Sequence, residues 1–127
     1  MTQLALLVAL MAKHFLCDFP LQRPYQYQNK GIYGHPGGLL HVSIHAAGTW
    51  LVAVLFVGPW AALGLALLDA VIHYHIDWAK NQINKRYSLN AHSGAWYWIV
   101  FGFDQFLHQL TYILLTIIAL QTGMMDG

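Results

Sequence analysis

The sequence is poor in charged residues, in cysteine and in glutamate, and each shortage narrows what the protein can be. Charged residues make up 9% and hydrophobic residues 57% of 127 positions, which is outside the range of ordinary soluble domains. The single cysteine, Cys17, cannot form an internal disulfide. Because lysine and arginine total 6 and form no basic tract, we expect no nucleic acid partner. Glutamate is absent, so every side-chain carboxylate is an aspartate.

Four apolar segments divide the chain, and each approaches the roughly 20 residues that a transmembrane helix needs. Only Gly58 and Pro59, a helix stop and a helix start, separate the second segment from the third. We therefore predict an all-α fold: a polytopic membrane protein with a single domain, residues 1–127, and four transmembrane helices in a compact bundle. The predicted helices cover residues 4–20, 38–57, 59–78 and 95–120.

Basic residues indicate the orientation of this predicted bundle. They gather in the two polar loops, 21–37 and 80–93, and positively charged loops face the cytoplasm. Both termini are therefore predicted to be non-cytoplasmic. Lys13 lies within the first predicted helix, and we expect its side chain to extend toward a lipid headgroup.

Histidine and aspartate residues recur four positions apart in every predicted helix. Residues at this spacing lie on one helical face about 5–6 Å apart, so two such side chains can reach one ion. Counted from the predicted cytoplasmic ends, all of these pairs fall in the same half of the bilayer. The predicted metal ligands are His14, Asp18, His41, His45, Asp69, His73, Asp77, Asp104 and His108.

The number and type of these ligands restrict the metal. They are too many for one tetrahedral ion and suit either two ions that share a bridging carboxylate or one ion with outer hydrogen-bond partners. Mixed imidazole and carboxylate donors favour a divalent metal, with zinc as first choice and manganese or iron as alternatives. A buried histidine and aspartate network without metal is the alternative interpretation.

The pattern favours an enzyme, a metal-dependent hydrolase in which one or two ions activate water and polarise a substrate oxygen. Asp18 or Asp69 would serve as ligand or general base, and Lys80 or Arg23 would hold an anionic group. The depth of the site favours a lipid-like, lipid-linked or phosphorylated substrate. Membrane lipid and an anionic small molecule are the expected partners, and a homo-oligomer is an open alternative.

Four alternative functions explain the histidine and aspartate pattern less well than a hydrolase does. A transport or channel component could pass a divalent cation or protons along the buried network, although the non-cytoplasmic half is almost entirely apolar. An oxidase acting on acyl chains would find little room among four short helices. A haem protein with two axial histidines would leave the aspartates unexplained. A purely structural protein, such as a phage lysis factor, would need no buried ionisable groups.

Several short motifs carry a family resemblance that spans essentially the whole chain. They are HFLCDFPLQ (14–22), Lys30, LH (40–41) with His45, HYHIDWAK (73–80) and DQFLH (104–108). Together they resemble an uncharacterised family of small bacterial and phage integral membrane proteins, domain of unknown function 3307. The resemblance implies a multi-pass protein of the bacterial inner (cytoplasmic) membrane but no established activity. It adds Gln22, Lys30 and Lys80 to the pattern, and makes Gln22 a further site candidate. Likeness to bacterial membrane-bound metal-dependent hydrolases is more remote and concerns fold and ligand type only.

Overall fold

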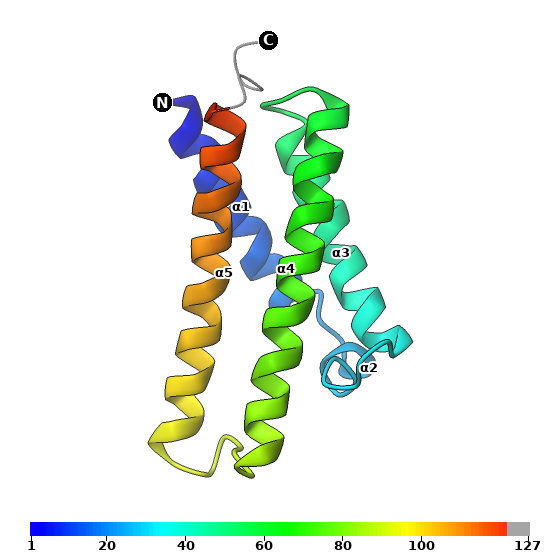
Figure 1. Cartoon of the computed structure of the whole chain (residues 1–127), viewed down its shortest axis with the longest axis vertical. Helices are drawn as coiled ribbons and strands as arrows, with labels where there is room; N and C mark the ends of the chain where they lie inside the picture. The colour runs from blue at the N-terminus through cyan, green and yellow to red at the C-terminus, as the bar shows by residue number, and fades with distance from the viewer. Residues whose placement is uncertain (122–127) are drawn as a thin grey trace.

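The computed structural model describes residues 1–121, and these form five α-helices and no strand (Figure 1). The fold is therefore all-α over this range, as predicted. In chain order the helices are α1 (Thr2–Asp18), α2 (Pro24–Tyr27), α3 (Pro36–Ala53), α4 (Pro59–Arg86) and α5 (Ala95–Gln121).

Proline starts three of these helices. Pro24, Pro36 and Pro59 occupy the first turns of α2, α3 and α4, where the fixed φ angle of proline is already helical and its missing N–H is not needed. The backbone between α3 and α4 reverses direction within residues 54–58. Nε1 of Trp50 donates to the carbonyl oxygen of Pro59 at 3.2 Å and ties the two helices together across this turn.

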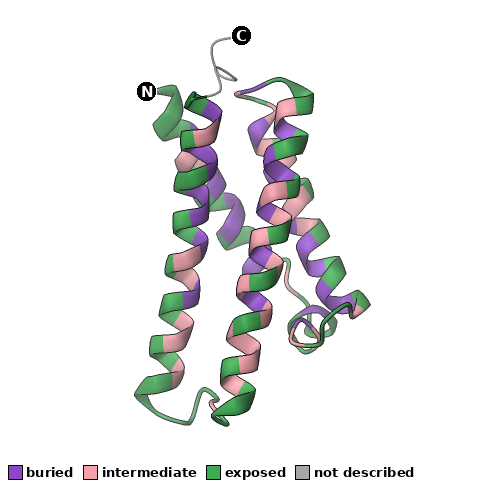
Figure 2. Ribbon diagram, viewed as in Figure 1, coloured by how far each residue is buried: buried purple, intermediate pink, exposed green. Residues whose placement is uncertain are grey.

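The four long helices form a closed bundle. Helix α1 packs against α3 and α5, α4 packs against α3 and α5, and the short α2 packs against α3. Helix α1 begins and α5 ends at the same end of the bundle, while α4 and α5 extend at the opposite end as an antiparallel pair (Figure 1). Burial follows this arrangement, because the projecting parts of α4 and α5 are mostly exposed or half-buried (Figure 2).

The bundle interior has an apolar layer and a polar layer. Leu6 and Leu10 of α1 and Tyr112 and Leu115 of α5 belong to the apolar layer, near the end where α1 begins. The second half of α1 and the middle of α3, of α4 and of α5 instead bury ionisable side chains. Buried polar and charged residues outnumber buried hydrophobic residues in residues 1–121. These polar groups must be paired with one another, because an unpaired buried charge is strongly destabilising.

The prediction of a polytopic membrane protein with four transmembrane helices is wrong. Among the helices of residues 1–121, only α5 is long and apolar enough to cross a membrane, by length and composition. Helix α1 has 17 residues and carries Lys13 in its second half, and α3 has 18 residues interrupted by His41 and His45. The predicted orientation, with both termini non-cytoplasmic, loses its basis with the four spans.

Two helix bounds differ from prediction in ways that shape the site. Helix α4 continues past residue 78 to Arg86, so Lys80 and Asn84 are helical residues one turn apart. Helix α2 lies inside the segment predicted as a polar loop and buries Gln26. Both differences add polar side chains to the interior next to the histidines.

Candidate metal centre

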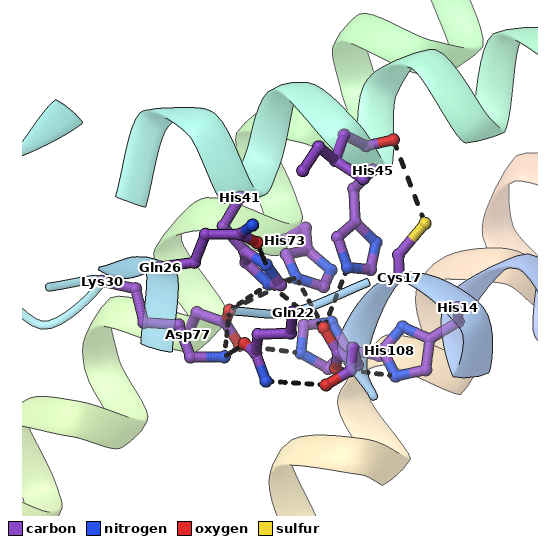
Figure 3. Close-up of polar contacts among 12 residues, drawn as sticks. His14, Cys17, Gln22, Gln26, Lys30, His41, His45, His73, Asp77 and His108 are labelled. Atoms are coloured by element: carbon purple, nitrogen blue, oxygen red, sulfur yellow. Dashed lines mark hydrogen bonds and ion pairs between the residues drawn. The ribbon is translucent and has the colours of Figure 1, made fainter. Parts of the chain in front are cut away.

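Imidazole nitrogens from α3 and α4 surround the carboxylate of Asp18, at the end of α1. Oδ1 of Asp18 lies 3.1 Å from Nε2 of His41, 2.9 Å from Nε2 of His45 and 3.7 Å from Nε2 of His73. The Nε2 atoms of His41 and His73 are 3.3 Å apart. Figure 3 shows the three imidazole rings converging in this way. All four side chains are buried, and we call them the Asp18 set.

Asp77 extends the cluster from the Asp18 set toward α5. Its Oδ2 lies 3.2 Å from Nε2 of His41 and 3.3 Å from Nε2 of His73, while its Oδ1 lies 3.3 Å from Nε2 of His108. Asp104 approaches the same nitrogen of His108 at 3.5 Å. Asp77, Asp104 and His108 form a second group of donor atoms close enough to hold an ion. Asp77 therefore stands between two donor sets, where a bridging carboxylate would stand.

His14 contacts Asp18 from one turn earlier on α1. Its Nε2 lies 3.2 Å from Oδ2 of Asp18 and 3.0 Å from Oε1 of Gln105. Nε2 of Gln105 donates to Asp104 at 3.1 Å, which fixes the amide so that its oxygen faces His14. Because that oxygen can only accept, Nε2 of His14 is a donor, and Nδ1 accepts from the hydroxyl of Tyr112 at 2.9 Å. In this arrangement His14 orients Asp18 through a hydrogen bond.

Charge pairing singles out Asp18 among the buried carboxylates. Three of them have a lysine partner, whereas no lysine of residues 1–121 lies within ion-pair distance of Asp18, whose partners are imidazoles. Its negative charge therefore has to be balanced by a proton on a histidine or by a bound cation. The lysine pairs are Lys13–Asp69 at 2.9 Å, Lys30–Asp77 at 3.0 Å and Lys80–Asp104 at 3.0 Å.

The ionisation of these groups follows from the same contacts. Burial raises the pKa of Asp18, but hydrogen bonds from His41 and His45 outweigh burial and hold the pKa of this carboxyl well below its usual range. Burial lowers the pKa of His45 to about 4 despite the contact with Asp18. Burial lowers the pKa of His73 well below its usual range as well. For His41, burial is outweighed by hydrogen bonds to Asp18 and Asp77, which raise the pKa, so an ion bound there would have to replace a proton.

Eight of the nine predicted ligands meet in this cluster, and Asp69 lies beside it. Oδ2 of Asp69 accepts hydrogen bonds from Lys13 and from the hydroxyl of Thr49. Lys13 also lies 3.4 Å from Nδ1 of His45 and donates to the hydroxyl of Tyr112 at 3.2 Å. Asp69 therefore reaches the Asp18 set through Lys13.

The prediction that Lys13 extends to a lipid headgroup is wrong, because its side chain is buried inside the bundle. A glycine on α3 makes the room: a Cβ at Gly48 would lie 2.8 Å from Cγ of Lys13. A lone lysine in the middle of an apolar helix was the available signal. This signal indicates a buried lysine only if its partner, Asp69 on α4, is known, and the sequence alone does not pair the two residues.

Residues before and within α2 hold the cluster from the side. Gln22, a predicted site candidate, donates from Nε2 to the backbone oxygen of Asp18 at 2.7 Å and accepts from Lys30 at 2.8 Å. Gln26 was not predicted, and its Oε1 accepts from Nδ1 of His41 at 3.2 Å. The position of Gln26, four residues after Gln22, was the only sequence signal, and it depends on a helical turn there.

Comparison with known proteins identifies the family. Residues 6–125 match the family model described as protein of unknown function (DUF3307), which confirms the resemblance seen in the sequence motifs. No curated protein and no solved structure matches the chain. The family description assigns no activity. The match covers nearly the whole chain, and the protein belongs to the DUF3307 family.

Proposed function

We propose that this protein is a metal-dependent hydrolase whose ion is bound by the Asp18 set. One observation carries the proposal. In a tetrahedral zinc site, bonds of about 2.0–2.1 Å place neighbouring ligand atoms about 3.3 Å apart. Four of the six separations within the Asp18 set are 3.1, 2.9, 3.7 and 3.3 Å and lie around this value, and all of its donor atoms lie within 4.8 Å of one another. Three imidazoles and one carboxylate thus already have the spacing of a coordination shell.

Imidazole and carboxylate donors suit zinc, manganese and iron. The separations that lie near the tetrahedral value favour zinc as first choice. A second ion would use Asp77, Asp104 and His108, with Asp77 between the two ions. A bound divalent ion supplies an activated water and a Lewis acid for hydrolysis. Asp18 would contribute a ligand oxygen, and His14 would hold that carboxylate in place.

The remaining predicted site residues have supporting roles in this proposal. Lys80, paired with Asp104, would hold the anionic group of a substrate next to the ion. Asp69 would hold Lys13 by their ion pair. Because an ammonium group only donates, an ion on Nε2 of His45 would require Lys13 to give up its 3.4 Å contact with Nδ1 of that ring. Helix α5 meets the criteria for a membrane span and carries exposed apolar side chains such as Phe103 and Phe106, which supports a lipid-like substrate.

The test is metal content per chain, measured by plasma mass spectrometry after incubation with zinc, manganese or ferrous ions. Wild type is compared with His73→Ala and with a matched control, His75→Ala, whose histidine is exposed on the same helix. We expect one or two equivalents in wild type and the control, and loss of metal in His73→Ala. A wild type that stays metal-free with every ion would contradict the proposal.

Hydrolysis is then assayed with the metal-loaded protein on phosphomonoesters, phosphodiesters and carboxylic esters. We expect turnover that chelation abolishes and that re-addition of the metal restores. A fully metal-loaded protein that hydrolyses none of these classes would rule out the hydrolase and leave a metal-binding protein.

A further inference from the structure

A pocket of about 250 Å³ opens beside the metal centre, next to α4 and α5. The residues that line it include Lys30 and Lys80, Gln22 and Asn84, and Tyr27 and Tyr97. The lining thus combines two cationic side chains with neutral donors and acceptors, which is the composition of a site for a small anionic ligand.

The two lysines of this pocket connect it directly to the metal centre. Nζ of Lys30 lies 3.0 Å from Oδ2 of Asp77. Nζ of Lys80 lies 3.0 Å from Oδ2 of Asp104 and 3.8 Å from Oδ1 of Asp77. A ligand that touches both ammonium groups would therefore lie within reach of an ion at Asp77.

Asn84 supplies a second, independent sign of a ligand. Its Oδ1 is buried and has no hydrogen-bond partner among residues 1–121. Buried polar atoms are normally paired, so a ligand hydroxyl could supply the donor that residues 1–121 do not. Asn84 follows Lys80 by one helical turn, which places the Cβ atoms of the two residues about 5–6 Å apart on one face of α4. A hydroxyl group next to a phosphate would satisfy both residues.

We propose that this pocket binds a small hydroxylated phosphomonoester, with the phosphate on Lys30 and Lys80 and a hydroxyl donating to Asn84. The inference rests on the proposed function and names the substrate class for the same centre. A second pocket at the centre, of about 210 Å³ beside His14, has no lysine or arginine in its lining. It therefore fits the phosphate less well.

Charge pairing makes phosphate binding depend on the metal. In the metal-free protein Asp77 and Asp104 neutralise Lys30 and Lys80, so little positive charge is left for an anion. A divalent ion at Asp77 adds two positive charges next to the same lysines. The phosphomonoester should therefore bind the metal-loaded protein more tightly, and by linkage it should tighten metal binding by the same factor.

The test is equilibrium dialysis of radiolabelled glycerol phosphate against metal-loaded and metal-free protein. We expect binding to the metal-loaded form. Binding to the metal-free form should be at least about tenfold weaker, which is a loss of about 1.4 kcal/mol of binding free energy. Metal-loaded Lys80→Gln should show a similar weakening. Asn84→Ala removes the unpaired acceptor without breaking an ion pair and should also weaken binding. Lys85→Gln, an exposed lysine on the same helix, is the matched control.

Metal content measured on the same samples separates the two proposals. Protein that loads metal but retains no glycerol phosphate, or that binds it equally well in Asn84→Ala and Lys80→Gln, would overturn the pocket assignment and leave the metal centre intact. Absence of metal would overturn the proposed function instead, and the pocket assignment with it. Competition by inorganic phosphate and by short-chain phosphatidic acid then identifies whether a soluble ester or a lipid headgroup is preferred.

Discussion

The side-chain oxygen of Gln26 accepts a hydrogen bond from Nδ1 of His41 at 3.2 Å. The amide nitrogen of Gln26 donates to the backbone oxygen of Leu21 at 3.3 Å, which fixes the amide orientation. Nδ1 of His41 therefore keeps its hydrogen, and Nε2 is the nitrogen directed at Asp18 and His73. Metal-bound histidines usually donate their other N–H in this way, which fixes the ring and raises its basicity.

Replacing Gln26 with leucine should weaken metal binding without removing a ligand. Loss of such an outer hydrogen bond typically costs about 10–100-fold in metal affinity. Competition with a chromophoric chelator gives the affinity of wild type and variant. Gln28→Leu is the control, because Gln28 is exposed beside α2. Equal affinities in all three proteins would show that Gln26 does not orient His41.

The faces of the helices could be predicted from the sequence because spacing alone determines them. His41 and His45, or Asp104 and His108, lie on one side of a helix wherever that helix packs. Each such pair does reach the cluster. The contribution of Gln26 could not be predicted in the same way, since it depends on a four-residue helix formed only after Pro24 within a polar loop.

Hydrophobicity was misleading about what surrounds the helices. An apolar segment gives the same signal whether protein or lipid covers it, and among the helices of residues 1–121 only α5 meets the criteria for a membrane span. The face of α1 that turns inward at Lys13 could not be predicted either. The burial of Lys13 depends on the missing side chain of Gly48 on α3 and on the carboxylate of Asp69. Such long-range pairing has no local signature in the chain.

Lys13→Met should destabilise the metal-free protein strongly. The side chain keeps its length but leaves the carboxylate of Asp69 buried without a cation, and breaking a buried pair in this way costs about 3–5 kcal/mol. Chemical denaturation measures the change in the free energy of unfolding. The double variant Lys13→Met/Asp69→Leu should recover most of the loss, because no charge is left unpaired.

Lys85→Met removes an exposed lysine and should change the free energy of unfolding by less than about 0.5 kcal/mol. If the double variant were as unstable as Lys13→Met, the loss would come from packing or from the contacts to His45 and Tyr112, and not from the unpaired carboxylate.

Cys17 should resist thiol reagents in the folded protein. The side chain is buried, and burial raises the pKa of its thiol, so little of the reactive thiolate exists at pH 8. Unfolding in denaturant should restore an ordinary thiol with a pKa of about 8.5 and a correspondingly fast reaction. The absorbance of an aromatic disulfide reagent follows both rates. Rapid labelling of the native protein at pH 8 would contradict the buried position of Cys17 in α1.

Removing the metal should lower thermal stability only in proteins that keep the Asp18 set intact. An ion that binds the folded state stabilises it by about 2.7 kcal/mol when its free concentration is 100 times the dissociation constant. In the metal-free centre the carboxylate of Asp18 is balanced by imidazoles alone, so the stabilisation by an added cation should be large. Thermal unfolding with and without chelator measures the effect. His73→Ala should unfold at the same temperature in both conditions, and His75→Ala should behave as wild type does. A chelator effect that persists in His73→Ala would place the stabilising ion outside the Asp18 set.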